Sequence, residues 1–159
     1  VLFRSGGIIQ ALPFFHDTNS VLVHNVDILS DIPLSDYYDR FKESEDDAWL
    51  LTQDRATTRK LLFNDQNLLI GWKQLKENQY KWVNGPKDNY KELAFNGIHI
   101  FNPTLFADLP LQRYSIIDLY LQAATKNRVR SAEIHPSYWF DLGKIEDFHQ
   151  ITLLLPPNS

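Results

Sequence analysis

Two aspartates stand where apolar runs end, a position from which a carboxylate can do chemistry. Asp27 closes the strand-like run in "SVLVHNVDIL", and Asp141 closes "YWFDLG" shortly before Gly143. Aspartate is also a good helix N-cap, so one interpretation is that each residue caps a helix that follows it. The other is a pair of strand-end carboxylates that holds a divalent metal, because Mg²⁺ prefers oxygen ligands and keeps several waters.

A glycine pair near the start, in Ser5-Gly6-Gly7, is the second candidate. One interpretation is an ordinary turn into a short helix that begins at Ile8 and ends at Pro13. The other is that Gly6 and Gly7 let a nucleotide approach the backbone, since a glycine has no side chain to block it. Neither G-x-G-x-x-G nor the Walker loop occurs in the chain, which argues against a dinucleotide dehydrogenase or a P-loop ATPase.

The histidines offer less. No H-E-x-x-H or comparable ligand spacing occurs, so packed or solvent-facing side chains are favoured for His16, His24, His99, His135 and His149. The alternative for His24 and His99, each in a candidate buried strand, is that they approach the site. No serine stands in a G-x-S-x-G elbow, so a hydrolase triad has no support.

Strand-like runs alternate with helical patterns along the chain, which predicts an α/β fold. Ligands in such sheets sit beyond the carboxyl ends of the strands, where Asp27 and Asp141 would stand. The run at 20–29 suggests a strand buried on both faces, as in a parallel sheet. Turn formers at 64–67 join two further runs, and a third follows, which predicts a β-hairpin insertion at about 55–90. The remaining strand candidates are 48–53, 92–101, 128–136 and 138–143.

Helices are expected at 33–47, at 114–127 with Ser115 as cap and Asn127 as stop, and at 144–155. Residues 102–109 suggest a short helical turn. Helical spacing places Leu34, Tyr37, Tyr38 and Phe41 in one apolar stripe. The acidic residues nearby suggest a solvated helix face and its exit turn; they are Asp39, Glu43, Glu45, Asp46 and Asp47. In the strand candidate at 92–101, Asn96-Gly97 suggests a bulge or a closely approaching ligand.

Composition excludes several classes. The chain has 159 residues, a formal net charge of -4 and no cysteine. The length fits one domain, and the charge gives no basic footprint for nucleic acid. Without cysteine there are no disulfides or thiolate metal sites, which is compatible with a bacterial cytoplasmic protein. No apolar run approaches the roughly 18 residues of a membrane span, so no membrane partner is expected.

Four stretches, in order along the chain, resemble the sugar-1-phosphate nucleotidyltransferase family, also called sugar-nucleotide pyrophosphorylases. "SGGIIQALPFF" resembles the family's T-G-G-G-I-x-x-A-L-x, with one glycine fewer and Ser for Thr. "VLVHNVDIL" resembles V-x-N-x-D-I-L, and "LAFNGIHIFNPTLF" resembles F-x-G-I-x-v-x-x-P-x-x-F. "YWFDLGKIEDF" resembles W-x-D-v-G-t-P-E-x-l without the usual proline, and "YSIID" stands for the family's "FSIID".

Within that family the chain is most similar to mannose-1-phosphate guanylyltransferase-like and N-acetylmuramate-1-phosphate uridylyltransferase-like bacterial enzymes. The resemblance implies a Rossmann-like mixed sheet flanked by helices, the nucleotide-diphospho-sugar transferase fold, in a single domain over 1–159. The family opens with a glycine-rich loop containing Arg and Lys, and this sequence shows no such loop and no methionine. We therefore expect a C-terminal portion of the enzyme, inactive alone, whose exposed sheet edge favours association into homo-oligomers.

The resemblance also implies the chemistry. A sugar 1-phosphate attacks the α-phosphorus of a nucleoside triphosphate and pyrophosphate leaves, with Asp27 and Asp141 as ligands of Mg²⁺. Gly6, Gly7 and Asn25 would bind the nucleotide. Asn96 and Gly97 would approach the sugar. Arg59 would reach the sugar or its phosphate, unless it is a solvated arginine at a strand edge.

Two other functions stay open. The first is a non-catalytic sugar-nucleotide-binding or regulatory module of the same fold. The second is a glycosyltransferase, but that class commonly holds its metal with D-x-D, and Asn25-Val26-Asp27 departs from that pattern.

Overall fold

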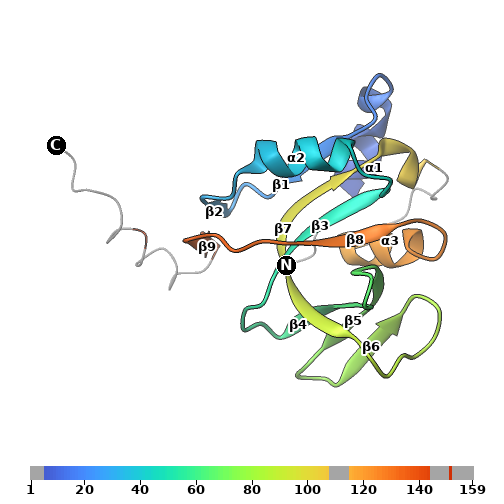
Figure 1. The fold of residues 1–159 in the computed structure, drawn as a ribbon, viewed down its shortest axis with the longest axis vertical. Coiled ribbons are helices and arrows are strands. Elements are labelled where there is room, and N and C mark those ends of the chain that lie inside the picture. The colour runs from blue at the N-terminus through green and yellow to red at the C-terminus, as the bar shows by residue number, and fades with distance from the viewer. Residues whose placement is uncertain (1–5, 108–114, 144–150, 152–159) are drawn as a thin grey trace.

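The computed structural model describes residues 6–107, 115–143 and 151, and a seven-stranded sheet forms its centre (Figure 1). The strands run in the order β6-β5-β4-β7-β3-β8, and β1 also pairs with β7. Their bounds are β1 Val21–His24, β3 Ala48–Gln53, β4 Arg59–Phe63, β5 Leu69–Gln74, β6 Gln79–Trp82, β7 Lys91–Phe101 and β8 Val129–Glu133. Together with its helices this sheet confirms the predicted α/β class.

Most neighbouring strands are antiparallel, and only β3 and β8 pair in parallel within this sheet as described. The prediction of a parallel strand for 20–29 was therefore wrong. β1 pairs antiparallel with β7, with Val21 opposite Phe101, and only Val21 of its residues is fully buried. The apolar run therefore predicted a strand, but neither its burial on both faces nor the direction of its neighbour.

The long strand β7 organises the sheet. β3 lies along one edge of β7, while β1 and β4 share the other edge. The predicted hairpin is present as β4, β5 and β6, and it extends the main sheet because β4 pairs with β7. Residues 55–90 are therefore continuous with the central sheet.

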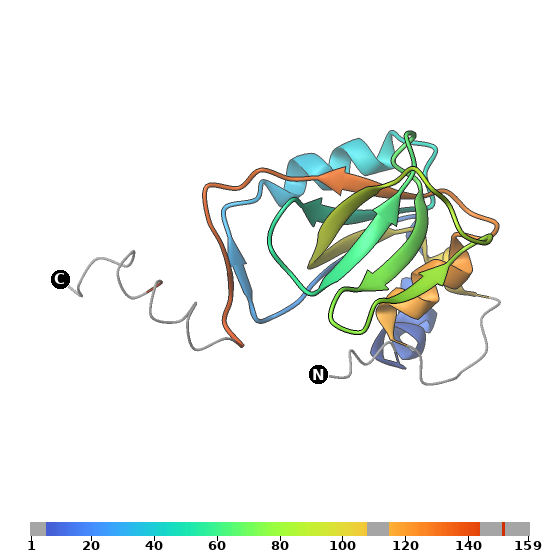
Figure 2. The same cartoon turned by 90° about the horizontal axis from the view of Figure 1, so that it is seen from below.

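Helices cover both faces of this sheet (Figure 2). One face carries α2 (Leu34–Lys42), and the other carries α1 (Gly6–Ala11), η1 (Leu12–Phe15), η2 (Pro103–Phe106) and α3 (Ile116–Ala123). Alternation along β3 supplies both interfaces. Ala48 and Leu50 pack in the cluster with α3, whereas Trp49 and Leu51 pack in the cluster with α2. None of the helices in the described ranges has the length and apolarity needed to cross a bilayer.

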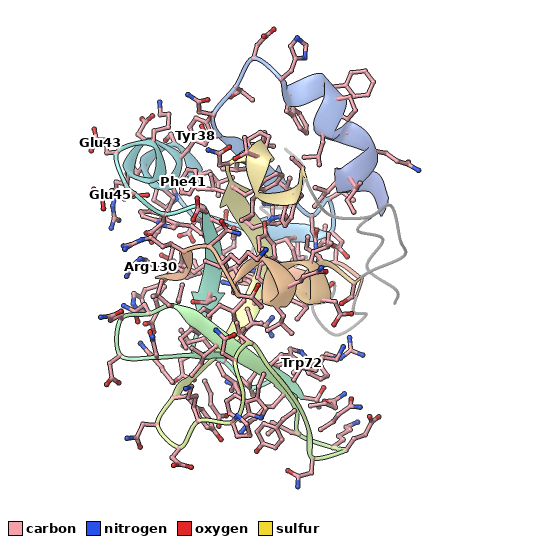
Figure 3. All side chains as sticks on the ribbon, turned by 90° about the vertical axis from the view of Figure 1, so that its right-hand side faces the viewer. Tyr38, Phe41, Glu43, Glu45, Trp72 and Arg130 are labelled. Atoms are coloured by element: carbon pink, nitrogen blue, oxygen red, sulfur yellow. The ribbon has the colours of Figure 1, made fainter. Side chains whose placement is uncertain are left out.

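The apolar stripe predicted on α2 is confirmed. Phe41 is buried in the core cluster on that face, and Leu34, Tyr37 and Tyr38, which are partly buried, pack against it. Figure 3 shows Tyr38 and Phe41 on the sheet side of α2, with Glu43 and Glu45 at the outer surface.

Local signals decided several helix ends. Ser115 caps α3, since its hydroxyl accepts the Asp118 N–H at 3.1 Å, and the Asn127 amide bonds the Ala123 carbonyl at 3.0 Å. The α-helix ends at Ala11, shortly before Pro13 as expected, and η1 follows, where proline is tolerated in the first turn. The helix predicted at 144–155 lies outside the described residues apart from Ile151.

A second, two-stranded sheet stands beside the main one (Figure 2). It consists of β2 (Ile28–Ser30) and β9 (Trp139–Asp141), paired antiparallel with Ile28 opposite Asp141. Asp31 secures the entry to β9, because its carboxylate accepts the Ser137 N–H at 3.0 Å. This small sheet carries one of the two predicted metal ligands, and the turn before it carries the other.

Candidate functional site

The fold brings Asp27 and Asp141 together. Asp27 lies in a tight turn between β1 and β2, closed by the Ile28 N–H on the Asn25 carbonyl at 3.1 Å. Asp141 ends β9, and the next N–H, from Leu142, donates to the Asp27 carbonyl at 2.7 Å. A Cβ placed on Gly143 would lie 3.1 Å from Asp141 Oδ1 and 3.7 Å from Asp27 Oδ2. Both carboxylates therefore approach one point in space.

Helix capping does not explain Asp27. The residue after it begins β2, so no helix follows for its side chain to cap. Asp141 does make a bond of capping type, because its Oδ1 accepts the Gly143 N–H at 3.1 Å. The helix that it would cap, 144–155, lies outside the described residues.

A bulge in β7 forms the next part of the site. The pairing of β3 with β7 shifts register between Leu50 and Thr52, opposite Asn96 and Gly97, which confirms the predicted bulge. Gly97 has a φ of 77°, a left-handed conformation that L side chains rarely adopt.

Asn25 is the group that lies against Gly97. Its N–H donates to the Gly97 carbonyl at 3.0 Å, and a Cβ at position 97 would come within 2.7 Å of its Nδ2. The missing side chain of Gly97 therefore makes room for the Asn25 carboxamide. This contact links the bulge to the turn that holds Asp27.

Asn96 is buried, with 1% of its surface exposed, and its Nδ2 has no hydrogen-bond partner among the described residues. Its Oδ1 accepts a bond from Arg55 Nε at 3.4 Å. Because a guanidinium can only donate, this bond fixes which end of the amide is the oxygen. A buried donor without an acceptor costs about 1–3 kcal/mol, so the bulge carries an unsatisfied N–H.

Sequence reasoning missed Arg55. It lies just after β3, donates from Nη2 to the Phe95 carbonyl at 3.1 Å, and places its Cζ 4.1 Å from the Trp139 ring centroid. Nothing local marks this residue, since these side-chain contacts reach Phe95, Asn96 and Trp139, each forty or more positions away in the chain. The candidate chosen from sequence, Arg59, is exposed at the start of β4.

The first helix holds the remaining candidates. Gly6 begins α1 and Gly7 follows, and a Cβ at Gly7 would meet nothing within 4 Å. The hydrogen bonds described above between the Asn25–Asp27 turn, Gly97 and the end of β9 do not involve these two glycines or Arg59. Their predicted roles in binding stay predictions.

The donor set fits a magnesium ion better than a zinc ion. Within the part of the chain that the structure describes, no group of three or more His, Cys, Asp or Glu side chains could hold a metal. Mg²⁺ is usually bound by one or two carboxylates, with waters and substrate phosphates completing its shell. Two converging carboxylates meet that requirement, whereas a structural zinc site needs four protein ligands.

His99 is a packed histidine, as predicted. It is 2% exposed, its Nδ1 lies 2.5 Å from the Tyr120 hydroxyl, and burial lowers its pKa to about 3. His16 and His135 are exposed, and His149 lies outside the described residues.

Solved structures share this fold. The chain superposes with a TM-score of 0.69 and 14% identity on a protein described as a glucose-1-phosphate thymidylyltransferase from Bacillus anthracis, in complex with sucrose. It covers 94% of this chain and 61% of that one. HddC from Yersinia pseudotuberculosis gives a TM-score of 0.67, with 14% identity and coverage of 94% and 60%.

The same HddC complexed with GMP-PN gives 0.66, with 13% identity and coverage of 94% and 60%. The chain thus spans about three-fifths of the length of the structures that it matches. No family model and no curated protein matches the sequence.

Proposed function

We propose that the full-length protein is a sugar-1-phosphate nucleotidyltransferase, which moves a nucleoside monophosphate from a nucleoside triphosphate to a sugar 1-phosphate and releases pyrophosphate. One observation carries the proposal: the Asp27 and Asp141 carboxylates approach the same point beside Gly143. The structures of similar fold support it, since one is described as a glucose-1-phosphate thymidylyltransferase and another is in complex with GMP-PN.

Electrostatics explain why the carboxylates would need a cation. Two unit charges 4 Å apart at an effective dielectric constant of 20 interact with about 4 kcal/mol, which is repulsive for a carboxylate beside a phosphate. Mg²⁺ bound at Asp27 and Asp141 would supply charge neutralisation at the phosphates and align the reacting groups. The donor set of the site, one carboxylate from the β1–β2 turn and one from the end of β9, agrees with this assignment.

The chain's other residues would hold and orient the substrates. Asn25, fixed against Gly97, would present its amide to the nucleotide beside Asp27. The unsatisfied Nδ2 of Asn96 would donate to a sugar hydroxyl at the bulge. No general base is required, because the attacking phosphate oxygen is already ionised at neutral pH. Holding the two reactants in line then accounts for most of what the protein must do.

The proposal is tested with the full-length protein and a matrix of nucleoside triphosphates and sugar 1-phosphates, in which released pyrophosphate is measured with Mg²⁺ and with EDTA. We expect one or a few pairs to release pyrophosphate with Mg²⁺ and none with EDTA. Tight binding of a sugar nucleotide with no release for any pair would instead identify the non-catalytic module.

A further inference from the structure

Arg55 touches both halves of the candidate site. Its Nη2 and Nε donate to Phe95 and Asn96 at the bulge of β7, at 3.1 Å and 3.4 Å. Its guanidinium carbon lies 4.1 Å from the centroid of the Trp139 ring in β9. The bulge belongs to the seven-stranded sheet and Trp139 to the two-stranded sheet, so this one side chain connects the two sheets where the site lies.

Trp139 and Asp141 share one face of β9. Successive residues of a strand point to opposite faces, and Phe140 between them is the buried one, 8% exposed. The position of the Trp139 ring therefore helps to set the direction in which the Asp141 carboxylate points. Asp141 in turn reaches the point that it shares with Asp27.

An arginine suits this place and a lysine does not. The guanidinium is planar, so it donates hydrogen bonds in its plane while its face stacks on an aromatic ring. A cation over tryptophan contributes about 0.5–2 kcal/mol, depending on how far it is desolvated. A lysine ammonium keeps the charge, but it cannot hold the two carbonyl-type acceptors and the ring in one fixed geometry.

We propose that Arg55 is a positioning residue that sets the separation between the Asp141 carboxylate and the Asn96–Gly97 bulge. Stacking on Trp139 holds β9, and the bonds to Phe95 and Asn96 hold the bulge. The expected effect of Arg55 on kinetics rests on the proposed function. The geometry itself can be measured without turnover.

The spectroscopic test uses the full-length protein labelled with 5-fluorotryptophan, with the Trp139 fluorine signal assigned by Trp139→Phe. Mn²⁺ bound at Asp141 would broaden that signal, since Trp139 is only two positions from Asp141 in β9 and a paramagnetic ion broadens the signals of nearby nuclei. Arg55→Lys should shift the Trp139 signal, and about 10- to 100-fold more Mn²⁺ should be needed for the same broadening. Loss of an outer partner of a metal ligand commonly lowers metal affinity by this factor. Arg40→Lys is the matched control, because the Arg40 guanidinium carbon lies 5.7 Å from the centroid of the Trp49 ring. This substitution should alter the Trp49 signal alone.

Kinetics separate positioning from a merely structural role. Arg55→Lys should lower kcat about 10- to 100-fold with a smaller change in KM, since substrate still binds but is misaligned. Trp139→Leu breaks the same stack from the other side, so the two changes together should cost little more than either alone.

An unchanged Trp139 signal and unchanged Mn²⁺ broadening in Arg55→Lys would overturn the proposal, as would fully additive kinetic losses in the double variant. If the wild type releases no pyrophosphate with any substrate pair, the proposed function fails, while the fluorine spectra still decide the role of Arg55. If Arg55→Lys does not fold, Trp139→Leu carries the same test through Mn²⁺ relaxation of the solvent protons.

Discussion

Among single residues, Asp46 differs most from what its surroundings in the sequence suggested. Its side chain is 5% exposed and accepts from Arg130 Nε at 2.7 Å, Arg128 Nε at 3.1 Å and Trp49 Nε1 at 2.8 Å. The expectation of a solvated acid was therefore wrong here, although Glu43 and Glu45 are exposed as predicted. The two arginines lie over eighty positions away, so no local pattern could pair them with Asp46. Figure 3 shows Arg130 below the end of α2.

The Asp46 cluster should make stability depend on acid. Burial alone would raise the pKa of Asp46, but hydrogen bonds from Arg130, Trp49 and Arg128 outweigh it and hold the pKa below its usual value. The stabilisation is present above the unfolded value of about 3.9 and is lost as pH falls through the folded one. Asp46→Asn should lower the free energy of unfolding by about 1.5–3 kcal/mol at pH 7 in urea titrations. That loss should shrink below pH 4, and Asp39→Asn, at an exposed ion pair, should change little at either pH.

The left-handed backbone at Gly97 leads to a second prediction, about stability. Gly97→Ala adds a methyl group 2.7 Å from Asn25 Nδ2 at a φ of 77°. The left-handed backbone alone should lower the free energy of unfolding by about 1–2 kcal/mol. Gly7→Ala is the control, since it meets nothing within 4 Å and lies in a helix, where alanine stabilises by about 0.5–1 kcal/mol over glycine. Equal effects of the two changes in urea unfolding would contradict the described packing of Asn25 on the bulge.

For the strands and helices, the periodicity of apolar residues and the positions of turn-forming residues were sufficient to predict most of them. The strand at 48–53 was predicted with its observed bounds, and the hairpin turn at 64–67 is closed by Asn64, whose Oδ1 accepts the Gln66 and Leu68 N–H groups. Strand direction was not predictable in the same way, because β1 meets β7 only through contacts about eighty residues apart. The same limit explains why Arg55 was missed while Asn96 and Gly97, marked by a glycine inside a strand, were found.

The packing of β7 on α3 predicts a further pH dependence. Burial lowers the pKa of His99 to about 3, so the ring is neutral in the folded protein beside Tyr120. An unfolded histidine binds a proton near pH 6.5, so the free energy of unfolding falls as pH drops from 6.5, by up to about 1.4 kcal/mol per pH unit. Replacing both residues by phenylalanine removes this titration. The free energy of unfolding, measured by urea titration, should then vary less with pH between pH 6.5 and 5. An unchanged pH dependence would contradict a buried, neutral His99 ring.

At the scale of the whole molecule, two sheets meet at the site. The seven-stranded sheet supplies Asn96 and Gly97, and the two-stranded sheet supplies Asp141. Asn25 and Asp27 lie between β1 and β2. We propose that 1–159 forms one domain, because β4 pairs with β7 and joins the hairpin at 55–90 to the central sheet. Sequence reasoning could name both aspartates because each ends an apolar run. That they approach one another depends on the pairing of β2 with β9, which the sequence did not reveal.

If Asp27 and Asp141 act as one divalent-cation site, pyrophosphate release by the full-length protein depends on Mg²⁺ and on both carboxylates. Asp27→Asn and Asp141→Asn should each lower kcat/KM by at least about 100-fold with the fold retained by circular dichroism. The double variant should lose little more, since ligands of one ion act as a unit. Asp65→Asn, in the exposed hairpin turn, should keep wild-type activity. Normal turnover in either single variant, with an unchanged Mg²⁺ requirement, would contradict a shared cation site.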